Sequence, residues 1–173
     1  MSLSLYELSV PSYLQILGAV SGYLEKGAKH CEAAGVDPET LVAARLIGDM
    51  APLKFQIVSV AHHSLGAIKG ATSGVFEPPA PVGDLDYAAL RALVVQTQGA
   101  LSALDAEAVN ALQGKDMVFA IGGRTIPFVA ENFILSFSLP NFYFHATTGY
   151  DILRANAVPL GKRDYLGQLR IKI

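Results

Sequence analysis

The sequence predicts an all-α fold: a four-helix bundle with one small β-hairpin between the third and fourth helices. Long segments in which apolar residues recur every three or four positions indicate the helices, and Gly- or Pro-containing breaks separate them. A Gly-Gly pair between two short apolar runs indicates the hairpin. A chain of 173 residues fits one domain, residues 1–173, and can bury about 70% of its unfolded surface.

The first helix is expected over residues 11–34. Ser9 is placed to cap it, and Pro11 suits a first helical turn, because the N–H that proline lacks would have no partner there. Gly35 follows as a natural end of the helix.

Two helical segments are expected next, over residues 38–50 and 53–69. Pro52 lies between them, and its ring and missing N–H predict a kink or a short break. Residues 70–84 are rich in proline and glycine, which predicts a long loop without regular structure.

The third helix is expected from Asp84 or Asp86, either of which can cap it, to about Leu104. The hairpin is expected over residues 117–126. Its turn is the pair Gly122–Gly123, because both turn positions then adopt positive φ without steric cost.

The fourth helix is expected over residues 127–156, with a bend at Pro140. The segment after it, VPLGKRDYLG, carries Lys162 and Arg163 but is expected to be a tail packed along the bundle. Tyr165 and Leu166 are its predicted anchors.

Composition limits the classes of function. Hydrophobic residues make up 51% of the chain and charged residues 16%, so its surface is poor in charge and a homodimer is favoured over a monomer. The net charge of −2 without a basic patch argues against nucleic-acid binding. No apolar run reaches the ~18 residues that span a membrane, and no basic leader opens the chain, which predicts a cytoplasmic protein.

Cys31 is the single cysteine, so neither an intramolecular disulfide nor a thiolate metal cluster is expected. Its place near the end of the first predicted helix indicates an exposed, inert thiol.

The histidines are the main candidates for chemistry. On the predicted helix 53–69, His62 lies on the flank of the apolar face and His63 lies nearly opposite that face. His62 is therefore expected to point inward, whereas His63 and His30 are expected on the surface.

A polar stripe is expected on the last helix, where Glu131, Ser138 and His145 are spaced by seven residues and Asn141 lies beside them. Two interpretations of His145 stay open. It lines a pocket, or it is a core residue held by Asn141 or by a backbone carbonyl.

Three segments, SLYELSVPSYLQIL, ARLIGDMAPLKFQI and LPNFYFHATTGYDILRANAVPLGKRDYLG, resemble an uncharacterised bacterial family of the DinB/YfiT-like superfamily, and the likeness covers nearly the whole chain. It implies a single DinB-like bundle of four helices that is usually a homodimer. In many DinB-like proteins one histidine of the second helix and two of a His-x-x-x-His on the last helix bind a divalent metal. Some members are thiol-dependent transferases.

The chain departs from that metal-binding pattern. His145 matches the last-helix region, but the position four residues on is Gly149, which has no ligating side chain. With His62 or His63 as the other imidazole, a site would need Asp49, Gln56, Glu131 or water to complete it.

Three hypotheses of function follow. In the first, a pocket at the bundle core binds a small, partly apolar ligand without a tightly bound metal or other cofactor. Its expected lining is Gln56, His62, Asn141, His145 and Tyr150. In the second, His62 and His145 hold a divalent metal such as zinc or nickel in a transferase or hydrolase. In the third, the chain is a structural or interaction protein that works as a dimer.

Overall fold

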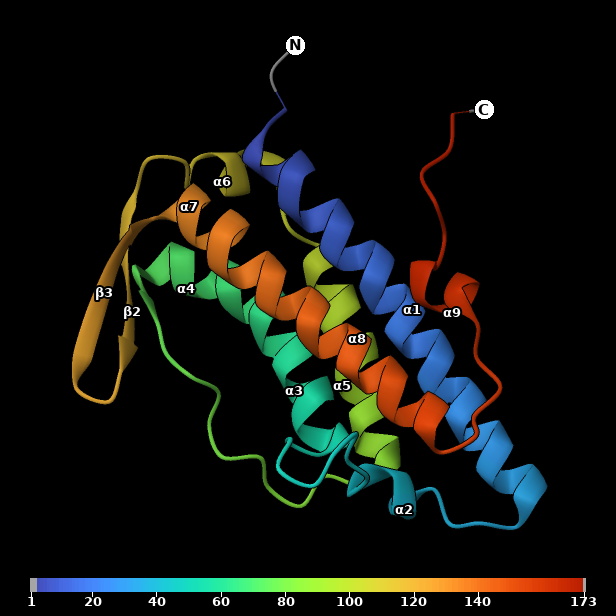
Figure 1. The fold of residues 1–173 in the computed structure, drawn as a ribbon. Coiled ribbons are helices and arrows are strands. Elements are labelled where there is room, and N and C mark those ends of the chain that lie inside the picture. Colours follow the sequence, from blue (N-terminus) through green and yellow to red (C-terminus); the bar gives the residue numbers. More distant parts are fainter. Residues whose placement is uncertain (1–2, 173) are drawn as a thin grey trace.

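A computed structural model describes residues 3–172 of the chain. The long helical segments of the structure run side by side (Figure 1). These are α1 (Leu5–Ala34), the segment that begins with α3 (Leu53–Ala61), α5 (Tyr87–Ser102), and the segment that ends in α8 (Leu139–Ala155). Helix α1 packs on α5 and α8, and so does α3, which closes the bundle. The predicted four-helix bundle is confirmed.

Helix α1 begins six residues earlier than the predicted Pro11. Ser4 is its cap: the Ser4 hydroxyl accepts from the N–H of Glu7, and the Glu7 carboxylate accepts from the N–H of Ser4. The predicted cap, Ser9, is instead buried inside the helix and donates to the carbonyl of Leu5. The reciprocal pair at the start sets the boundary, and Pro11 is accommodated inside the helix. Gly35 ends it, as expected.

The predicted helix over residues 38–50 is wrong for most of its length. Only α2 (Glu39–Val42) forms, and turns fill the rest up to Pro52. The short helix still supports the bundle, because the carboxylate of Glu39 accepts from the N–H of Tyr87 at the start of α5. The break at Pro52 is confirmed, and Pro52 stands as the N-terminal flanking residue of α3.

The second bundle helix contains a wide turn. Helix α3 passes into a π-helical turn, η1 (His62–Gly66), and then into α4 (Ala67–Ser73). The expected loop after residue 69 therefore starts later. It also contains a short strand, β1 (Val75–Phe76), that was not predicted.

Asp86 caps α5, as expected, by accepting from the N–H of Ala89. A short helix, α6 (Ala106–Asn110), follows it and was not predicted, although Asp105 caps it in the same way.

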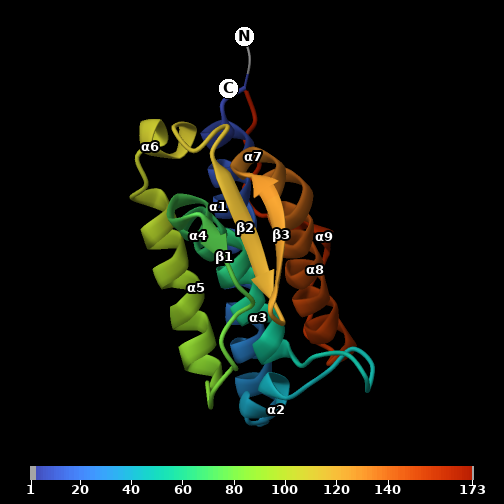
Figure 2. The same cartoon turned by 90° about the vertical axis from the view of Figure 1, so that its left-hand side faces the viewer.

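The hairpin is confirmed as β2 (Asp116–Ile121) and β3 (Arg124–Val129), joined at Gly122 and Gly123, which both have positive φ. Strand β1 pairs in parallel with β2, so the sheet order is β1-β2-β3. Figure 2 shows the sheet on one side of the bundle, between α5 and α8. Pro127, the predicted start of a helix, lies in β3, which is an edge strand of this sheet and tolerates its missing N–H.

The last bundle helix begins with α7 (Ala130–Phe133), widens into a second π-helical turn, η2 (Ile134–Ser138), and continues as α8. The disturbance expected at Pro140 thus takes the form of a π-turn directly before it. Helix α9 (Lys162–Leu166) then lies against α1 and confirms the packed tail. Gln15 donates to the carbonyl of Leu166, and Tyr165 packs on Tyr150.

The core fills the space between the four helices, and its largest fully buried side chains include Tyr13, Tyr23, Phe133 and Phe142. Cys31 is 2% exposed and belongs to this core, so its predicted exposure is wrong. It is buried because it lies on the same face of α1 as the buried Leu24 and Gly27, at helical spacing. Within residues 3–172, no helix is long and apolar enough to cross a membrane.

Candidate functional site

Three imidazoles gather where the second bundle helix faces α8. His62 and His63 open the π-turn η1, and His145 comes from the middle of α8. The ring of His63 stacks on that of His145, with centroids 5.5 Å apart and planes inclined by 15°. His62 meets His63 edge-on at 5.6 Å. We call His63 and His145 the histidine pair.

The predicted orientations of His62 and His63 are reversed. His63 is 7% exposed, whereas His62 is only half-buried. Leu65 is half-buried, whereas the buried side chains Gln56, Val60, His63 and Ala67 follow one another at steps of three and four residues. The core face of this helix therefore includes His63, and the prediction was wrong because it placed the centre of the apolar face too far round the helix.

His145 is held by Gln56 of α3. Its Nδ1 lies 2.8 Å from Oε1 of Gln56, and Nε2 of Gln56 donates to the carbonyl of Ala51 at 2.9 Å. Gln56 is 2% exposed and His145 is half-buried. Asn141, the partner expected for His145, instead donates to the carbonyl of Phe137 in its own helix. Neither predicted partner of His145 is the actual one.

Of the other predicted lining residues, His62 lies beside the pair and Tyr150 lies in a different part of the bundle. Nε2 of His62 lies 2.7 Å from the carbonyl of Glu77, beside a shallow hollow of about 370 Å³. Tyr150 packs edge-on between Tyr23 and Tyr165, against α1 and α9. The structure therefore brings together Gln56, His62 and His145, adds His63 to them, and places Tyr150 in another aromatic group.

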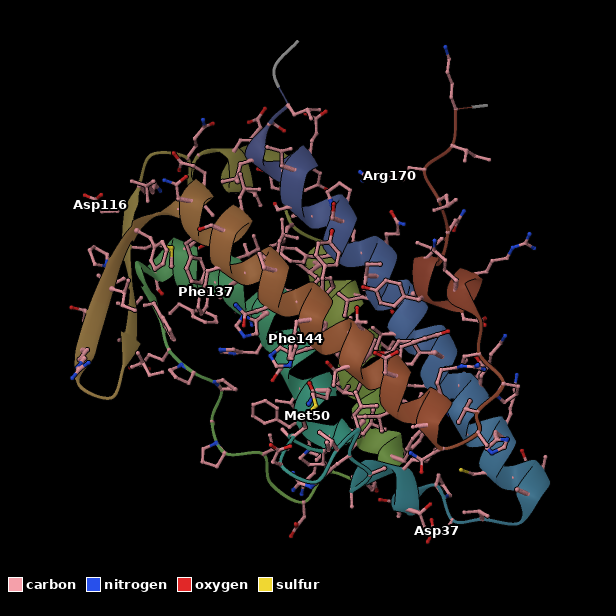
Figure 3. The ribbon with its side chains drawn as sticks, viewed as in Figure 1. Asp37, Met50, Asp116, Phe137, Phe144 and Arg170 are labelled. Carbon is pink, nitrogen blue, oxygen red and sulfur yellow. The ribbon has the colours of Figure 1, made fainter. Side chains whose placement is uncertain are left out.

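Aromatic side chains surround the histidine pair. Phe55 and Phe144 meet the ring of His145 edge-on, at 5.8 and 5.3 Å, and Phe137 lies 5.7 Å from His63. Phe144 is 57% exposed, so the aromatic surface continues to the outside of the protein. Figure 3 shows Phe137 and Phe144 along the same helix, well separated from Arg170 on the C-terminal tail.

All three imidazoles are neutral near pH 7. Burial and, to a smaller extent, the neighbouring imidazoles of His145 and His62 together lower the pKa of His63 to about 3. Burial alone lowers the pKa of His145 to about 4, and it also lowers the pKa of His62. The site therefore presents neutral hydrogen-bonding groups among aromatic rings and has no positive charge with which to attract an anion.

A chain of buried hydroxyls fixes the backbone beneath the pair. Ser138, in η2, donates to the carbonyl of His63 in η1. Since a serine hydroxyl has one proton, the remaining contact, between Ser138 and Tyr13, requires the phenol of Tyr13 to donate. The two π-turns thus face each other through one bond. Sequence reasoning placed Ser138 on the polar stripe but missed its contact with His63 and missed Tyr13 altogether.

The donor set does not fit a divalent metal held by three side chains. Among residues 3–172, no group of three His, Cys, Asp or Glu side chains is arranged to hold a metal ion. Glu131 accepts from the N–H of Gly114, and Asp49 lies exposed in a turn. A side chain at Gly149 has no room, because its Cβ would lie 2.9 Å from the hydroxyl of Tyr23. With Nε2 of His62 engaged at the carbonyl of Glu77, the imidazoles of His63 and His145 and the amide of Gln56 remain.

A larger hollow lies elsewhere. It measures about 980 Å³ and is open, and it runs along α1 between Gln98 of α5 and the C-terminal tail at Arg170. Its lining contains one charged side chain and no histidine or carboxylate. Size alone would favour this hollow, but the groups capable of specific chemistry are at the histidine pair.

Comparison with known proteins agrees with the fold. The sequence profile of a family described as a domain of unknown function (DUF1993) matches residues 5–166. The chain is also similar to a crystal structure described as a DinB family member from Shewanella denitrificans, with 25% identity and a TM-score of 0.77. That similarity covers 98% of this chain and 95% of the other. No curated protein matches the sequence.

Proposed function

The chain belongs to the DUF1993 family of DinB-like proteins, and we propose that it binds a small, partly apolar ligand at the histidine pair without a tightly bound metal. The observation that carries this proposal is the stacked pair itself. Two neutral imidazoles lie in a ring of phenylalanines, and one of them, His145, reaches the surface beside the exposed Phe144.

The surroundings of the pair support a binding site over a purely structural cluster. Nδ1 of His63 is the one buried side-chain nitrogen or oxygen without a partner among the described residues. An unpaired buried polar atom costs stability, so its persistence needs an explanation such as a functional role. The combination of an apolar wall with a few converging polar groups is typical of small-molecule sites.

Histidine-selective NMR tests the proposal. Protein labelled with ¹⁵N in histidine is titrated with neutral aromatic and aliphatic fragments of up to about ten heavy atoms. We expect the resonances of His63 and His145 to shift saturably, while His30, on α1, serves as an internal control that does not move. Fragments that leave the resonances of His63 and His145 unmoved up to millimolar concentration would contradict the proposal.

The absence of a tight metal is tested separately. Elemental analysis of protein purified without a metal-affinity tag is expected to give sub-stoichiometric zinc, nickel and iron. A stoichiometric metal that is lost in His145→Ala would instead favour the alternative, a metal-dependent transferase or hydrolase using the pair.

We also propose that the chain forms a homodimer. The outer side of the last bundle helix and its π-turn carries exposed apolar residues, among them Leu135 and Tyr143. Sparse surface charge supports the same reading. Light scattering is expected to give twice the monomer mass at micromolar concentration, and the double variant Leu135→Glu with Tyr143→Glu is expected to give the monomer. A monomeric wild type would contradict this proposal.

A further inference from the structure

A backbone carbonyl sets the orientation of the Gln56 amide. The carbonyl of Ala51 only accepts, so the atom of Gln56 that lies 2.9 Å from it must be the NH₂ group. Turning the amide over would place two oxygens against each other. The Oε1 of Gln56 therefore faces His145 and is itself an acceptor.

The orientation of Gln56 in turn sets the tautomer of His145. An acceptor 2.8 Å from Nδ1 requires the proton of the neutral ring to be on Nδ1. Nε2 then carries a lone pair and no proton. No side chain or backbone group among residues 3–172 hydrogen-bonds to this nitrogen, and it is not among the buried unpaired atoms, so it is open to solvent.

We infer that the site selects neutral ligands that donate a hydrogen bond, through an alcohol, phenol or amide, to Nε2 of His145, while their apolar part packs on Phe144 and Phe55. This inference rests on the proposed function and adds the chemical class of the ligand. A carboxylate presents lone pairs to the lone pair of His145 and is disfavoured.

The neighbouring histidines do not offset this preference. Nε2 of His62 faces the carbonyl of Glu77, so its proton is engaged there. His63 is buried against His145 and lacks a positive charge near pH 7. Lys69 lines the hollow beside His62 and is the one cationic side chain among the residues that line it.

The tautomer is measured first, without any ligand. Long-range ¹H–¹⁵N correlation spectra of histidine-labelled protein at pH 7 are expected to show Nδ1 of His145 protonated and Nε2 unprotonated.

Three probes of matched size are then titrated: benzyl alcohol, toluene and benzoate. Benzyl alcohol is expected to bind about tenfold more tightly than either of the others, which is the effect of one hydrogen bond.

Gln56→Leu removes the acceptor that fixes the tautomer of His145 and nearly keeps the volume of the side chain. The neutral ring can then carry its proton on Nε2, which becomes a donor. The preference for benzyl alcohol over benzoate is expected to fall at least about tenfold. Gln98→Leu, at a half-buried glutamine in the other hollow, is the matched control and is expected to leave the preference unchanged.

Each outcome decides between the inference and the proposed function. A proton on Nε2 of His145 overturns the inference whatever binds. The expected tautomer together with equal or tighter binding of benzoate also overturns the inference and leaves a ligand site at the pair. The expected tautomer with no binding of any probe at the pair overturns the proposed function and the inference with it.

Discussion

Ser138, in the π-turn of the last bundle helix, donates a hydrogen bond of 2.5 Å to the backbone carbonyl of His63, in the π-turn of the second bundle helix. A π-helical turn interrupts the regular pattern of backbone hydrogen bonds in a helix. Here the side chain of Ser138, in one π-turn, provides a donor for the carbonyl of His63 in the other. The bond also places the backbone that carries His63 directly against the helix that carries His145.

Ser138→Ala is expected to lower the free energy of unfolding by about 2–4 kcal/mol, because it leaves the phenol of Tyr13 and the carbonyl of His63 buried without partners. Urea denaturation measures the loss. Ser136→Ala, at an exposed serine of the same turn, is the control and should cost under about 0.5 kcal/mol. Equal losses in the two variants would mean that the buried hydrogen bonds of Ser138 with Tyr13 and His63 do not stabilise the fold.

His145→Ala is expected to cost about 1–2 kcal/mol. The substitution leaves Oε1 of the buried Gln56 unpaired, but water reaches the half-exposed space and limits the loss. Denaturant melts with an unchanged m-value measure it. A loss near zero would show that the bond to Gln56 is not formed, and one above about 3 kcal/mol would show a ring that is part of the solid core.

Stability should fall as the solution becomes acidic. The pKa values of His63, about 3, and His145, about 4, lie below the ordinary 6.5. Between these values and 6.5, the two imidazoles are protonated in the unfolded chain and neutral in the folded chain. Their contribution is complete above pH 6.5 and is lost as the pH falls toward their folded values, with a slope of up to about 1.4 kcal/mol per pH unit for each group.

We therefore expect a loss of at least about 2 kcal/mol between pH 6.5 and about pH 4.5, measured by urea denaturation at a series of pH values. The carboxylates with lowered pKa values, Glu7, Glu25 and Asp164, stay ionised across most of this range. His63→Leu should remove about half of the slope that His63 and His145 contribute. A flat profile in the wild type would refute the assignment.

Gly149→Ala is expected to destabilise the protein by about 1–3 kcal/mol, although alanine is the better helix former, because the new Cβ would lie 2.9 Å from the buried hydroxyl of Tyr23. Gly99→Ala is the matched control: nothing lies within 4 Å of its Cβ, and a gain of about 0.5–1 kcal/mol is expected. Combining Gly149→Ala with Tyr23→Phe should recover part of the loss, and failure to do so would place the strain elsewhere.

Features with local signals were predictable from the sequence. The cap at Asp86 and the turn at Gly122–Gly123 each depend on a few adjacent residues, and both formed as expected. The start of α1 was also readable: Ser4 and Glu7 have the spacing of a capping box, but Pro11 was given more weight.

Features that depend on distant partners were not predictable. Strand β1 has two residues and is stable only because β2 pairs with it. His63 is buried and His62 is half-buried, the reverse of the prediction, because the side of this helix that packs on α8 and α5 carries His63. Gln56 and His145 were both expected in the site, yet their bond joins residues 89 positions apart, and no local pattern selects that partner over Asn141.

The parallel pairing of β1 with β2 has a kinetic consequence. Val75 meets Val118 only after the chain has closed a loop that contains the whole of α5 and α6. Closing so long a loop is entropically slow, so the sheet should form late, after α5 has docked on α1. The amide protons of β1 should then exchange with solvent faster than those of the bundle helices. In limited proteolysis, the first cleavage is expected beside β1.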